Sequence, residues 1–375
     1  MHAGKTLISD KQKACAFCGE YANVSRLPRD PRKDETVKKT KSQLIQHCNA
    51  CNDERTGMCS KFTLEELNFA LQRLPTGKAA GKDTITNEML MQLSDKALLN
   101  ICNISWLQHT TPGDWKHATI IPVPKKGKPL NKLGSFRPIS LTSCAAKLCK
   151  RLVKARLQYW VESNNILTNY QSGFRPNRST EDQVLRITQL AEDGLRHKER
   201  KRSILVLIDF SRAFDKVWRE GLYTKALQLG APPCLVKWLQ AFLTDRKANV
   251  RFGNSTSEYL PFKEGCPQGA VLSPDMFLIF INDLATKLTE DHPNIHISLF
   301  ADDLALLSQD RSIDTATREM QRALDTLTNW ATEWKMKIAP EKCETLLITL
   351  DLAQAKTKPA VCQLSHSTLT PNSSV

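Results

Sequence analysis

The sequence predicts an α+β fold, because short apolar strands occur in the same chain as long segments with helical spacing. The segment Ser203–Asp209 (SILVLID) is rich in β-branched residues, which is typical of a buried strand. Two more apolar strands, Ile295–Phe300 and Leu304–Leu307, are joined by the tripeptide Ala-Asp-Asp. Residues 273–289 and 313–335 have the apolar periodicity of helices. We therefore expect a mixed α+β architecture.

The N-terminal part of the chain changes character at Phe62. Residues 1–61 are polar and basic, so we expect a linker or a weakly ordered lead-in there. Thr63 and Glu66 then have the spacing of a capping box, and leucines follow at helical spacing. We therefore assign residues 62–105 to a helical segment of its own.

Further strands and helices are expected in the middle of the chain. Residues 119–124 are typical of a strand, and a basic stretch rich in Pro and Gly follows them. Thr180 and Gln183 have capping-box spacing at the start of a helix that runs to about Arg196. Residues 250–252 and 258–260 are compatible with the two strands of a hairpin around Gly253–Asn254. Other helices are expected at residues 142–163, 213–229 and 233–243.

The composition favours a polyanionic partner. Lys and Arg number 53 against 39 Asp and Glu, a formal net charge of +14. Such a balance favours nucleic acid before an anionic membrane. No apolar run approaches the ~20 residues that span a bilayer, and the N-terminus lacks the apolar stretch of a signal peptide. We expect no membrane segment, and free thiols at the twelve scattered cysteines.

The strongest chemical signal is the pair Asp302–Asp303 between two apolar strands. A charged tight turn is ordinary, and by itself it predicts only a solvated hairpin tip. Here both flanks are hydrophobic, and Asp209 likewise ends a buried strand. Buried carboxylates are costly unless they are paired or bind a metal. Oxygen-only ligands select Mg²⁺ or Mn²⁺ over zinc, and two such ions about 3.5–4 Å apart catalyse in-line phosphoryl transfer.

Several motifs resemble those of reverse transcriptases and follow the same order. IDFSRAFDKVW (208–218), GCPQGAVLSPDMFLIFINDL (265–284) and LFADDLALL (299–307) look like the palm motifs of that family. FRPISL (136–141) and QSGFRPNRST (171–180) resemble the fingers motifs of non-LTR retrotransposon enzymes, particularly the jockey-like group. A lone Ala-Asp-Asp would carry almost no weight, whereas linked motifs in the right order are highly specific.

The resemblance implies a right-hand polymerase with fingers and an antiparallel palm sheet backed by helices, at residues 106–350. The chain runs out where the family carries its primer-grip hairpin, so we expect residues 351–375 to be a truncated tail and the thumb to be missing. The implied activity is RNA-directed DNA polymerisation, with an RNA template, a DNA primer or target, and dNTPs. The family suggests a location in the nucleus or cytoplasm.

On this resemblance, Asp209 and Asp302 bridge two Mg²⁺ or Mn²⁺ ions, and Asp303 supports the site. The backbone carbonyl of Phe210 is a further metal ligand. Lys342, in APEKCE, resembles a lysine that protonates the leaving pyrophosphate. These five residues form the expected catalytic group.

The incoming dNTP is expected to meet a second group of residues. Phe214 stands at the family's steric gate, where a ring excludes the 2′-OH; without the motif it would be a core residue of the following helix. Asp215 is expected to cap that helix. Gln268 and Gly269, in PQG, resemble residues that line the nucleotide and the template base, although Pro-Gln-Gly alone predicts only a turn.

Three basic residues complete the implied binding site. Lys125 and Arg137 match fingers residues that hold the triphosphate, a role that suits the bidentate fork of Arg. Arg175 is implied to contact the template backbone. Without the motifs, either Lys125 or Arg137 could be a solvated surface charge.

Two cysteine pairs leave an alternative open. Cys15-x-x-Cys18 and Cys48-x-x-Cys51 have zinc-like spacing, and His47 lies beside the second pair. The segment around the first pair is, however, similar to the linker between endonuclease and polymerase in jockey-like proteins. We do not expect that linker to bind metal, so zinc is the less favoured interpretation.

Two other functions are compatible with the sequence. The chain could be a non-enzymatic remnant that only binds nucleic acid, since the carboxylates are present but the primer grip is not. An RNA-dependent RNA polymerase shares the palm. For that class we would expect Gly in place of Ala301 and a polar residue in place of Phe214.

Overall fold

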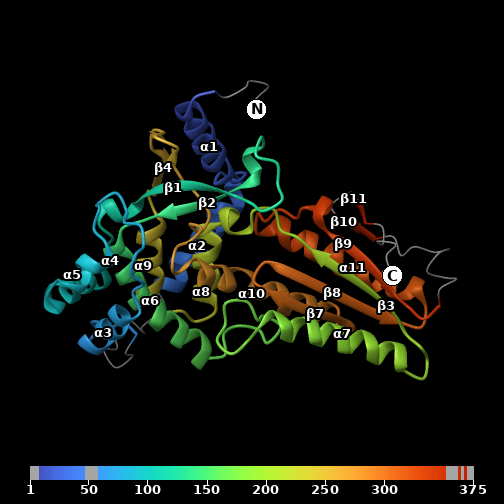
Figure 1. Cartoon of the computed structure of the whole chain (residues 1–375). Coiled ribbons are helices and arrows are strands. Elements are labelled where there is room, and N and C mark those ends of the chain that lie inside the picture. The colour runs from blue at the N-terminus through green and yellow to red at the C-terminus, as the bar shows by residue number, and fades with distance from the viewer. Residues whose placement is uncertain (1–7, 47–57, 352–361, 365–366, 370–375) are drawn as a thin grey trace. The chain divides into compact units, whose positions relative to one another are not determined.

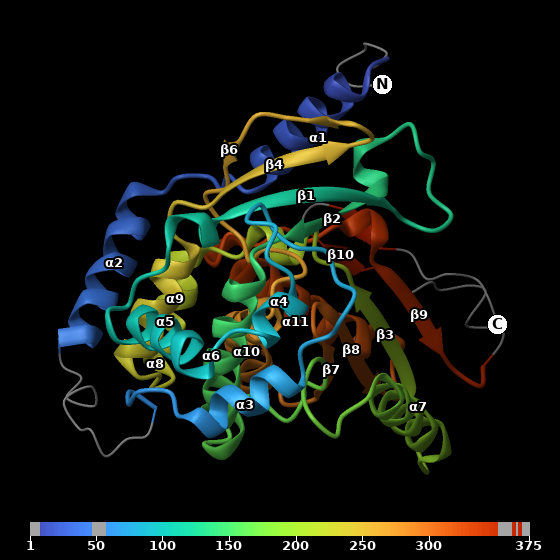
Figure 2. The ribbon, with the colours of Figure 1, turned by 60° about the vertical axis from the view of Figure 1, so that its left-hand side comes forward.

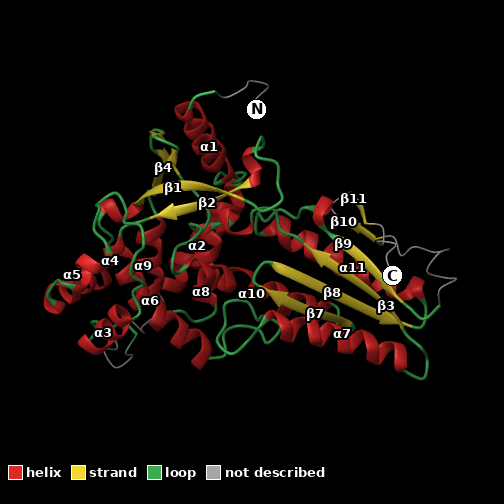
Figure 3. Cartoon of the chain, viewed as in Figure 1, coloured by secondary structure: helices red, strands yellow, loops and turns green. Residues whose placement is uncertain are grey.

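The chain divides into two compact units in the computed structural model, which describes residues 8–46, 58–351, 362–364 and 367–369. Unit 1 comprises Met1–Asn164 and Phe214–Met276, and unit 2 comprises Asn165–Ala213 and Phe277–Val375. Both units combine helices with strands (Figure 3). The predicted α+β class is therefore confirmed.

Unit 1 contains a five-stranded sheet and eight of the described helices. The strands are β1 (His117–Pro124), β2 (Phe136–Leu141), β4 (Lys247–Phe252), β5 (Ser255–Thr256) and β6 (Leu260–Pro261). The helices are α1 (Asp10–Val24), α2 (Pro31–Gln46), α3 (Leu64–Gln72), α4 (Asn87–Met91), α5 (Asp95–Leu107), α6 (Cys144–Ser163), α8 (Arg219–Gln228) and α9 (Pro233–Leu243). Short 3₁₀ helices are η2 (Gly113–Lys116), η3 (Leu133–Ser135) and η4 (Ala213–Lys216), the last of which crosses the unit boundary.

The sheet of unit 1 is mixed. Its strand order is β2-β1-β4-β5, and β6 also pairs with β4. Strand β1 is antiparallel to β2 and parallel to β4. Helix α1 lies against this sheet (Figure 2), where Phe17, Cys18 and Tyr21 join Ile120 and Val250 in one buried cluster. The expected linker at residues 1–61 is therefore wrong for its described part, because a few apolar residues give α1 a buried face.

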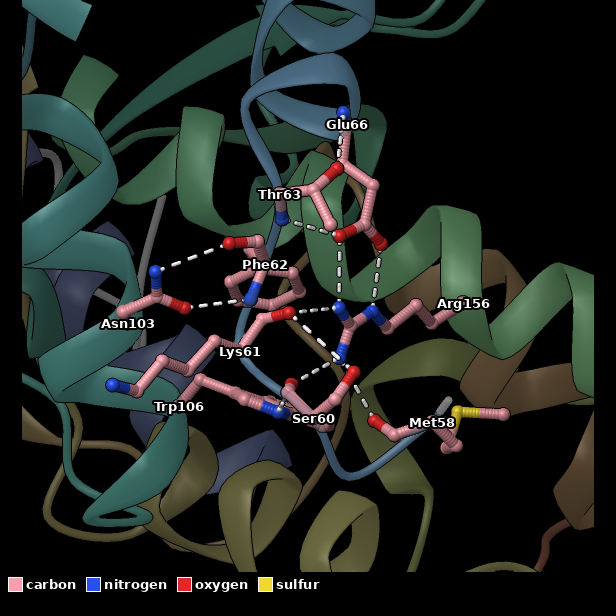
Figure 4. A network of polar contacts seen from close by, with 9 residues as sticks. All are labelled: Met58, Ser60, Lys61, Phe62, Thr63, Glu66, Asn103, Trp106 and Arg156. Atoms are coloured by element: carbon pink, nitrogen blue, oxygen red, sulfur yellow. Dashed lines mark hydrogen bonds and ion pairs between the residues drawn. The ribbon is translucent and has the colours of Figure 1, made fainter. Parts of the chain in front are cut away.

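Residues 58–66 are fastened to α6 by a buried arginine (Figure 4). The Arg156 guanidinium donates to both carboxylate oxygens of Glu66, at 2.7 and 2.8 Å. It also donates to three backbone carbonyls, those of Met58, Ser60 and Lys61. Glu66 in turn accepts the Thr63 N–H, which confirms the predicted capping box. The helical segment predicted at residues 62–105 belongs to unit 1.

Unit 2 contains a four-stranded sheet and a separate hairpin. The strands are β3 (Arg202–Ile208), β7 (Ile295–Phe300), β8 (Asp303–Asp310), β9 (Glu344–Ile348), β10 (Cys362–Leu364) and β11 (Ser367–Leu369). The helices are α7 (Thr180–Arg196), α11 (Ile313–Glu333), η5 (Pro340–Lys342) and all but the start of α10 (Ser273–Asp291), which crosses the boundary at Met276.

The four-stranded sheet of unit 2 is antiparallel throughout, in the order β7-β8-β3-β9. Successive side chains on a strand point to opposite faces. Ile204, Val206 and Leu306 are fully buried on one face, against which α11 packs. Helix α7 lies along the other face (Figure 1). The apolar runs of the sequence therefore form a sheet with one fully buried face.

Three local expectations need correction. The helix at α7 has the predicted extent, but its capping box is formed by Ser179 and Asp182, one residue earlier. The helix expected at residues 213–229 is split into η4 and α8. Strand β4 turns at Gly253–Asn254 as predicted. The returning segment is divided into β5 and β6, so Leu260 pairs with Ala248, whereas residues 258–259 lie between the two short strands.

The tail and the cysteines also differ from expectation. A short antiparallel hairpin, β10–β11, lies in the segment 351–375 that was predicted to be a truncated tail, and β10 packs on α11. Cys59 and Cys234 form a disulfide within unit 1, whereas the other eight cysteines of the described residues are free. The sequence could not predict this pair, because the fold brings together cysteines 175 residues apart. None of the described helices is long and apolar enough to cross a membrane.

Candidate active site

The three predicted carboxylates lie at the ends of adjacent strands in unit 2. Ile208 pairs with Leu304 in the β3–β8 ladder, so Asp209 and Asp303 occupy the next register position. Side chains at opposite positions of an antiparallel pair share a face and lie close together. Asp302 stands in the two-residue turn between β7 and β8, beside Ala301. The strand pairing therefore gathers all three residues.

Asp209 and Asp303 open onto a groove of about 470 Å³ on the face of the sheet that α7 partly covers. The groove wall is mainly apolar, with contributions from Val184, Ile187, Leu207, Phe300 and other residues of α7 and the sheet. Leu207 is 38% exposed, in contrast to the buried side chains on the opposite face of β3. The carboxylates thus belong to the accessible face of the sheet.

Burial and mutual repulsion raise the pKa of two of the carboxyls. The pKa of Asp302 is raised chiefly by loss of hydration, then by the charges of Asp303 and Asp209, while its own backbone N–H and Lys342 act in the opposite sense. The pKa of Asp303 is raised by partial loss of hydration and by the charge of Asp209. Like charges held this close favour protonation or a bound cation.

Lys342 supplies one positive charge to this group. It ends η5, and its Nζ lies 2.9 Å from Asp209 Oδ1. The lysine and aspartate side chains are 56% and 39% exposed, so the pair adds at most about 1 kcal/mol of stability. The predicted general-acid candidate is therefore in contact with a predicted metal ligand.

The backbone around Asp209 is fixed by the segment that precedes η5. The Asp209 carbonyl accepts from the Ala339 N–H at 2.9 Å, and the Lys337 carbonyl accepts from the Ser211 N–H at 2.7 Å. Phe210 is buried, and its ring packs against Trp330 at 6.3 Å between centroids. Because neighbouring side chains of a strand alternate, the buried Phe210 ring leaves Asp209 on the open face.

The donor set fits a divalent cation in its chemistry. Its atoms are carboxylate oxygens, and their mutual repulsion is what such an ion relieves. Within the described ranges, however, no three His, Cys, Asp or Glu side chains converge in a metal-binding geometry. Asp209 instead meets the Lys342 ammonium. The three aspartates lie at neighbouring strand ends, but their side chains do not form a coordination shell for a metal ion.

The residues predicted to hold the triphosphate lie on the β1–β2 hairpin of unit 1. Val123 pairs with Arg137, and the Lys125 N–H donates to the Ser135 carbonyl just beyond the paired region. Lys125 Nζ donates to the Gly134 carbonyl at 2.9 Å. Arg137 is exposed. Both cations therefore belong to one hairpin, and the arginine has access to solvent.

Phe214 and the Pro-Gln-Gly turn are joined by hydrogen bonds within unit 1. The Phe214 carbonyl accepts the Cys266 N–H at 2.8 Å. Phe214 lies in η4 and is partly buried. Gly269 has φ +83°, as the third residue of a type II turn requires.

Asp215 orients Gln268 and does not cap a helix, which corrects the expectation. Gln268 Nε2 donates to Asp215 Oδ2 at 2.8 Å, and Trp218 is the N-cap residue of α8. The Gln268 carbonyl also accepts from the Ser140 N–H of β2 at 3.4 Å. Sequence reasoning missed this role of Asp215, because the partners are 53 residues apart.

Two other predicted sites receive little support. Arg175 is buried, and its guanidinium donates to the carbonyls of Thr168 and Gln171, so its described contacts lie within its own loop. Cys18 is buried beside α1's apolar neighbours, whereas Cys15 is exposed. The other two cysteines of the zinc alternative, Cys48 and Cys51, lie outside the described residues, as does His47.

Comparison with known proteins identifies the class. Residues 123–366 match the family described as reverse transcriptase (RNA-dependent DNA polymerase), and the chain therefore belongs to that family. The resemblance noted in its motifs is confirmed. Reverse transcriptases generally use a divalent metal ion, which agrees with the carboxylate chemistry of the site.

The relatives come from non-LTR retrotransposons. The chain is 33% identical over 294 residues to the RNA-directed DNA polymerase from mobile element jockey of Drosophila melanogaster, covering 76% of this chain and 31% of the relative. It is 34% identical over 302 residues to the probable RNA-directed DNA polymerase from transposon BS of the same species, covering 79% and 33%. A third relative, from transposon X-element, is 30% identical over 300 residues, covering 79% and 32%. The chain thus spans about a third of the length of these relatives.

Proposed function

We propose that this chain carries the catalytic domain of an RNA-directed DNA polymerase of a non-LTR retrotransposon. It would add dNTPs to the 3′-OH of a DNA primer or target on an RNA template. The observation that carries the proposal is that Asp209 and Asp303 line the open groove of the antiparallel sheet, with Asp302 in the adjoining β7–β8 turn. In this proposal the four-stranded sheet of unit 2 is the palm, and the sheet of unit 1 belongs to the fingers.

Asp209, Asp302 and Asp303 would hold two Mg²⁺ or Mn²⁺ ions, with the Phe210 carbonyl as a further ligand. Such ions lower the pKa of the attacking hydroxyl and neutralise the charge that develops on the leaving pyrophosphate. The carboxylates must be ionised to do this, so the raised pKa values of Asp302 and Asp303 favour function at neutral or higher pH. Lys342, already beside Asp209, would donate a proton to the pyrophosphate.

Unit 1 would hold the nucleotide. Lys125 and Arg137 would bind the triphosphate, and the half-buried Phe214 would exclude a ribose 2′-OH. Gln268 and Gly269 would line the sugar and the base. Asp215 keeps the Gln268 amide in one orientation, which supports this role.

Nucleic acid would bind through the net charge of +14 and the family's template and primer contacts. The Arg175 guanidinium donates hydrogen bonds to two backbone carbonyls of its own loop. In this proposal the loop that carries Arg175, and not the guanidinium, contacts the template. We propose no zinc site. The alternative of a remnant that only binds nucleic acid makes a different prediction, because it would bind a hybrid without extending it.

The test is primer extension on an RNA template, with this chain and with the jockey polymerase in which this chain replaces the matching region. We expect Mg²⁺-dependent extension that Asp302→Ala abolishes. The matched control is Asp310→Ala, at the opposite end of β8 from the turn, which should extend normally. Hybrid binding without extension in both forms would favour the remnant, and extension by Asp302→Ala would overturn the site.

A further inference from the structure

The loop that precedes α7 runs alongside the edge of the unit 2 sheet. Gln171 and Leu299 form a parallel bridge. The Leu299 carbonyl accepts the Ser172 N–H at 2.9 Å, and the Tyr170 carbonyl accepts the Leu299 N–H at 3.0 Å. This short segment therefore extends the sheet at β7, next to the turn that carries Asp302.

The Gln171 side chain binds both polar groups of Ala301. Its Oε1 accepts the Ala301 N–H at 2.8 Å, and its Nε2 donates to the Ala301 carbonyl at 3.2 Å. The same Oε1 accepts the Gly173 N–H at 2.8 Å. Gln171 is 1% exposed, so these groups have no access to water as a substitute partner. A primary amide that bonds both the N–H and the C=O of one residue in this way fixes the backbone of that residue.

The turn needs such support. Ala301 has φ +57°, a left-handed conformation that costs an L-residue about 1–2 kcal/mol. The first central residue of a two-residue hairpin turn takes a positive φ in type II′, where Gly is usual. Here an alanine occupies it, immediately before Asp302. Without these hydrogen bonds, Ala301 would be expected to relax to a negative φ, which would move the Asp302 carboxylate.

Gly173 allows the close approach. A Cβ atom at this position would collide with the backbone nitrogen of Ala301 and with the preceding carbonyl carbon. The loop and the turn are thus in backbone contact, with the Gln171 amide between them. This contact explains the spacing of Gln and Gly in the QSG sequence, for which the polymerase roles proposed above give no reason.

We propose that Gln171 is a positioning residue that fixes the Ala301–Asp302 turn and thereby the direction of the Asp302 carboxylate. Gly173 provides the space for this contact. We call the contact of Gln171 and Gly173 with the Ala301–Asp302 turn the clamp. The clamp lies within unit 2, and only its effect on metal binding rests on the proposed polymerase function.

The test compares two glutamine variants of the whole chain. Gln171→Met keeps the length of the side chain and removes all three hydrogen bonds. The matched control is Gln309→Met on β8, whose amide donates to the Leu190 carbonyl and the Ser203 hydroxyl, both at 2.8 Å, away from the turn. Mn²⁺ affinity is measured by electron paramagnetic resonance, and backbone amide exchange by NMR.

We expect Gln171→Met to weaken Mn²⁺ binding by about tenfold or more, the usual effect of removing a group that orients a metal ligand. The amides of Ala301 and Gly173 should exchange faster, while those of the β3–β8 ladder stay protected. Gln309→Met should lose a similar amount of thermal stability and keep its Mn²⁺ affinity. An unchanged affinity in Gln171→Met, or an equal loss in both variants, would overturn the proposal.

Gln171→Glu keeps the inference testable if the methionine variant does not fold. An ionised glutamate retains the acceptor for the two N–H groups and loses the donor to the Ala301 carbonyl. The carboxylate oxygen that replaces Nε2 would face the Ala301 carbonyl oxygen and repel it. We therefore expect the side chain to shift, the Ala301 amide to exchange faster than in the parent chain, and Mn²⁺ binding to weaken. A faster-exchanging Ala301 amide together with the parent's Mn²⁺ affinity would overturn the proposal.

Asp302→Asn separates the failure of the clamp from the failure of the proposed function. If this variant keeps the parent's Mn²⁺ affinity, the proposed metal site fails. If it abolishes binding while Gln171→Met does not weaken it, only the clamp fails.

Discussion

Each unit of this molecule holds a cluster of like charges, and the two clusters differ in their access to solvent. In unit 2, Asp209, Asp302 and Asp303 stand at a groove of about 470 Å³ or in the turn beside it. In unit 1, Lys150 and Arg246 are 1% and 4% exposed and both lie over the Phe242 ring, at 5.1 and 5.0 Å. A dissolved cation can relieve the first cluster, whereas the second is almost entirely removed from solvent.

The two clusters show that a group of like charges can bind a cation only when solvent reaches it, whereas a buried group only destabilises the fold. Burial and the charge of Arg246 lower the pKa of Lys150 to about 7, and burial with the charge of Arg219 lowers that of Arg246 to about 9. Arg246 Nη1 finds no hydrogen-bond partner in the described part of the chain. Both clusters oppose folding, but only the open one offers a site that a metal can occupy.

The largest expected effect comes from neutralising the open cluster. Asp302→Asn should reduce primer extension by about 10³-fold or more, since a bound metal contributes several kcal/mol to the transition state.

The same change should stabilise the metal-free protein at pH 7. The raised pKa of Asp302 means that the folded state binds a proton more tightly than the unfolded state. Protonated Asp302 therefore stabilises the folded state at low pH, and this contribution is lost as pH rises through the folded pKa.

Thermal unfolding with and without Mg²⁺ checks both halves of that prediction. Mg²⁺ should raise the Tm of the unmodified chain and have less effect on Asp302→Asn. Without metal, the Tm advantage of the variant should shrink as pH falls toward the ordinary carboxyl range. A variant that is less stable than the parent at pH 7 would mean that Asp302 makes a favourable contact which outweighs the repulsion.

A second prediction tests the division of labour between the units. Phe214→Ala should raise rNTP incorporation relative to dNTP incorporation by roughly 10- to 200-fold, the range expected for one lost contact of about 1–3 kcal/mol. Competition between dCTP and CTP in single-nucleotide extension measures it. Phe252→Ala, a second aromatic residue of unit 1 on β4, is the matched control and should leave the ratio unchanged. A folded, active Phe214→Ala with unaltered discrimination would place the gate elsewhere.

The sequence predicted those features that depend on local pattern. The strands β3, β7 and β8 have apolar runs of strand length, and the carboxylates follow from where these runs end. The antiparallel pairing of β7 with β8 follows from the tight Ala-Asp-Asp connection between them. The family resemblance then supplied the roles of the carboxylates, which the structure alone does not test.

The features that were missed depend on contacts between distant residues. The Gln171 amide meets Ala301 across 130 residues, and no property of Gln171 in its own segment indicates that partner. The polar and basic composition of residues 1–61 as a whole predicts a linker, whereas six of the fifteen residues of α1 are buried, Phe17 and Tyr21 among them. Composition reports the average of a segment, whereas packing depends on the one face that is buried.

The smallest expected effect concerns the closed cluster of unit 1. Lys150→Met should stabilise the protein at neutral pH by about 1–3 kcal/mol, because it removes a buried like charge beside Arg246 and leaves an apolar chain in its place. The Lys150 ammonium donates to the Thr142 hydroxyl at 3.4 Å, a weak bond whose loss subtracts little. Urea denaturation at pH 6.5 measures the change.

The dependence of that gain on pH gives the sharper test. With a folded pKa of about 7 against 10.5 for an ordinary lysine, the unfolded chain binds more protons between these values. The stability of the parent therefore rises with pH across this window, and the advantage of Lys150→Met should shrink between pH 6.5 and pH 9. Lys147→Met, on the same helix but only partly buried, should change stability by less than about 0.5 kcal/mol at either pH. An advantage of Lys150→Met that stays constant with pH would show that packing, and not the buried charge, accounts for the gain.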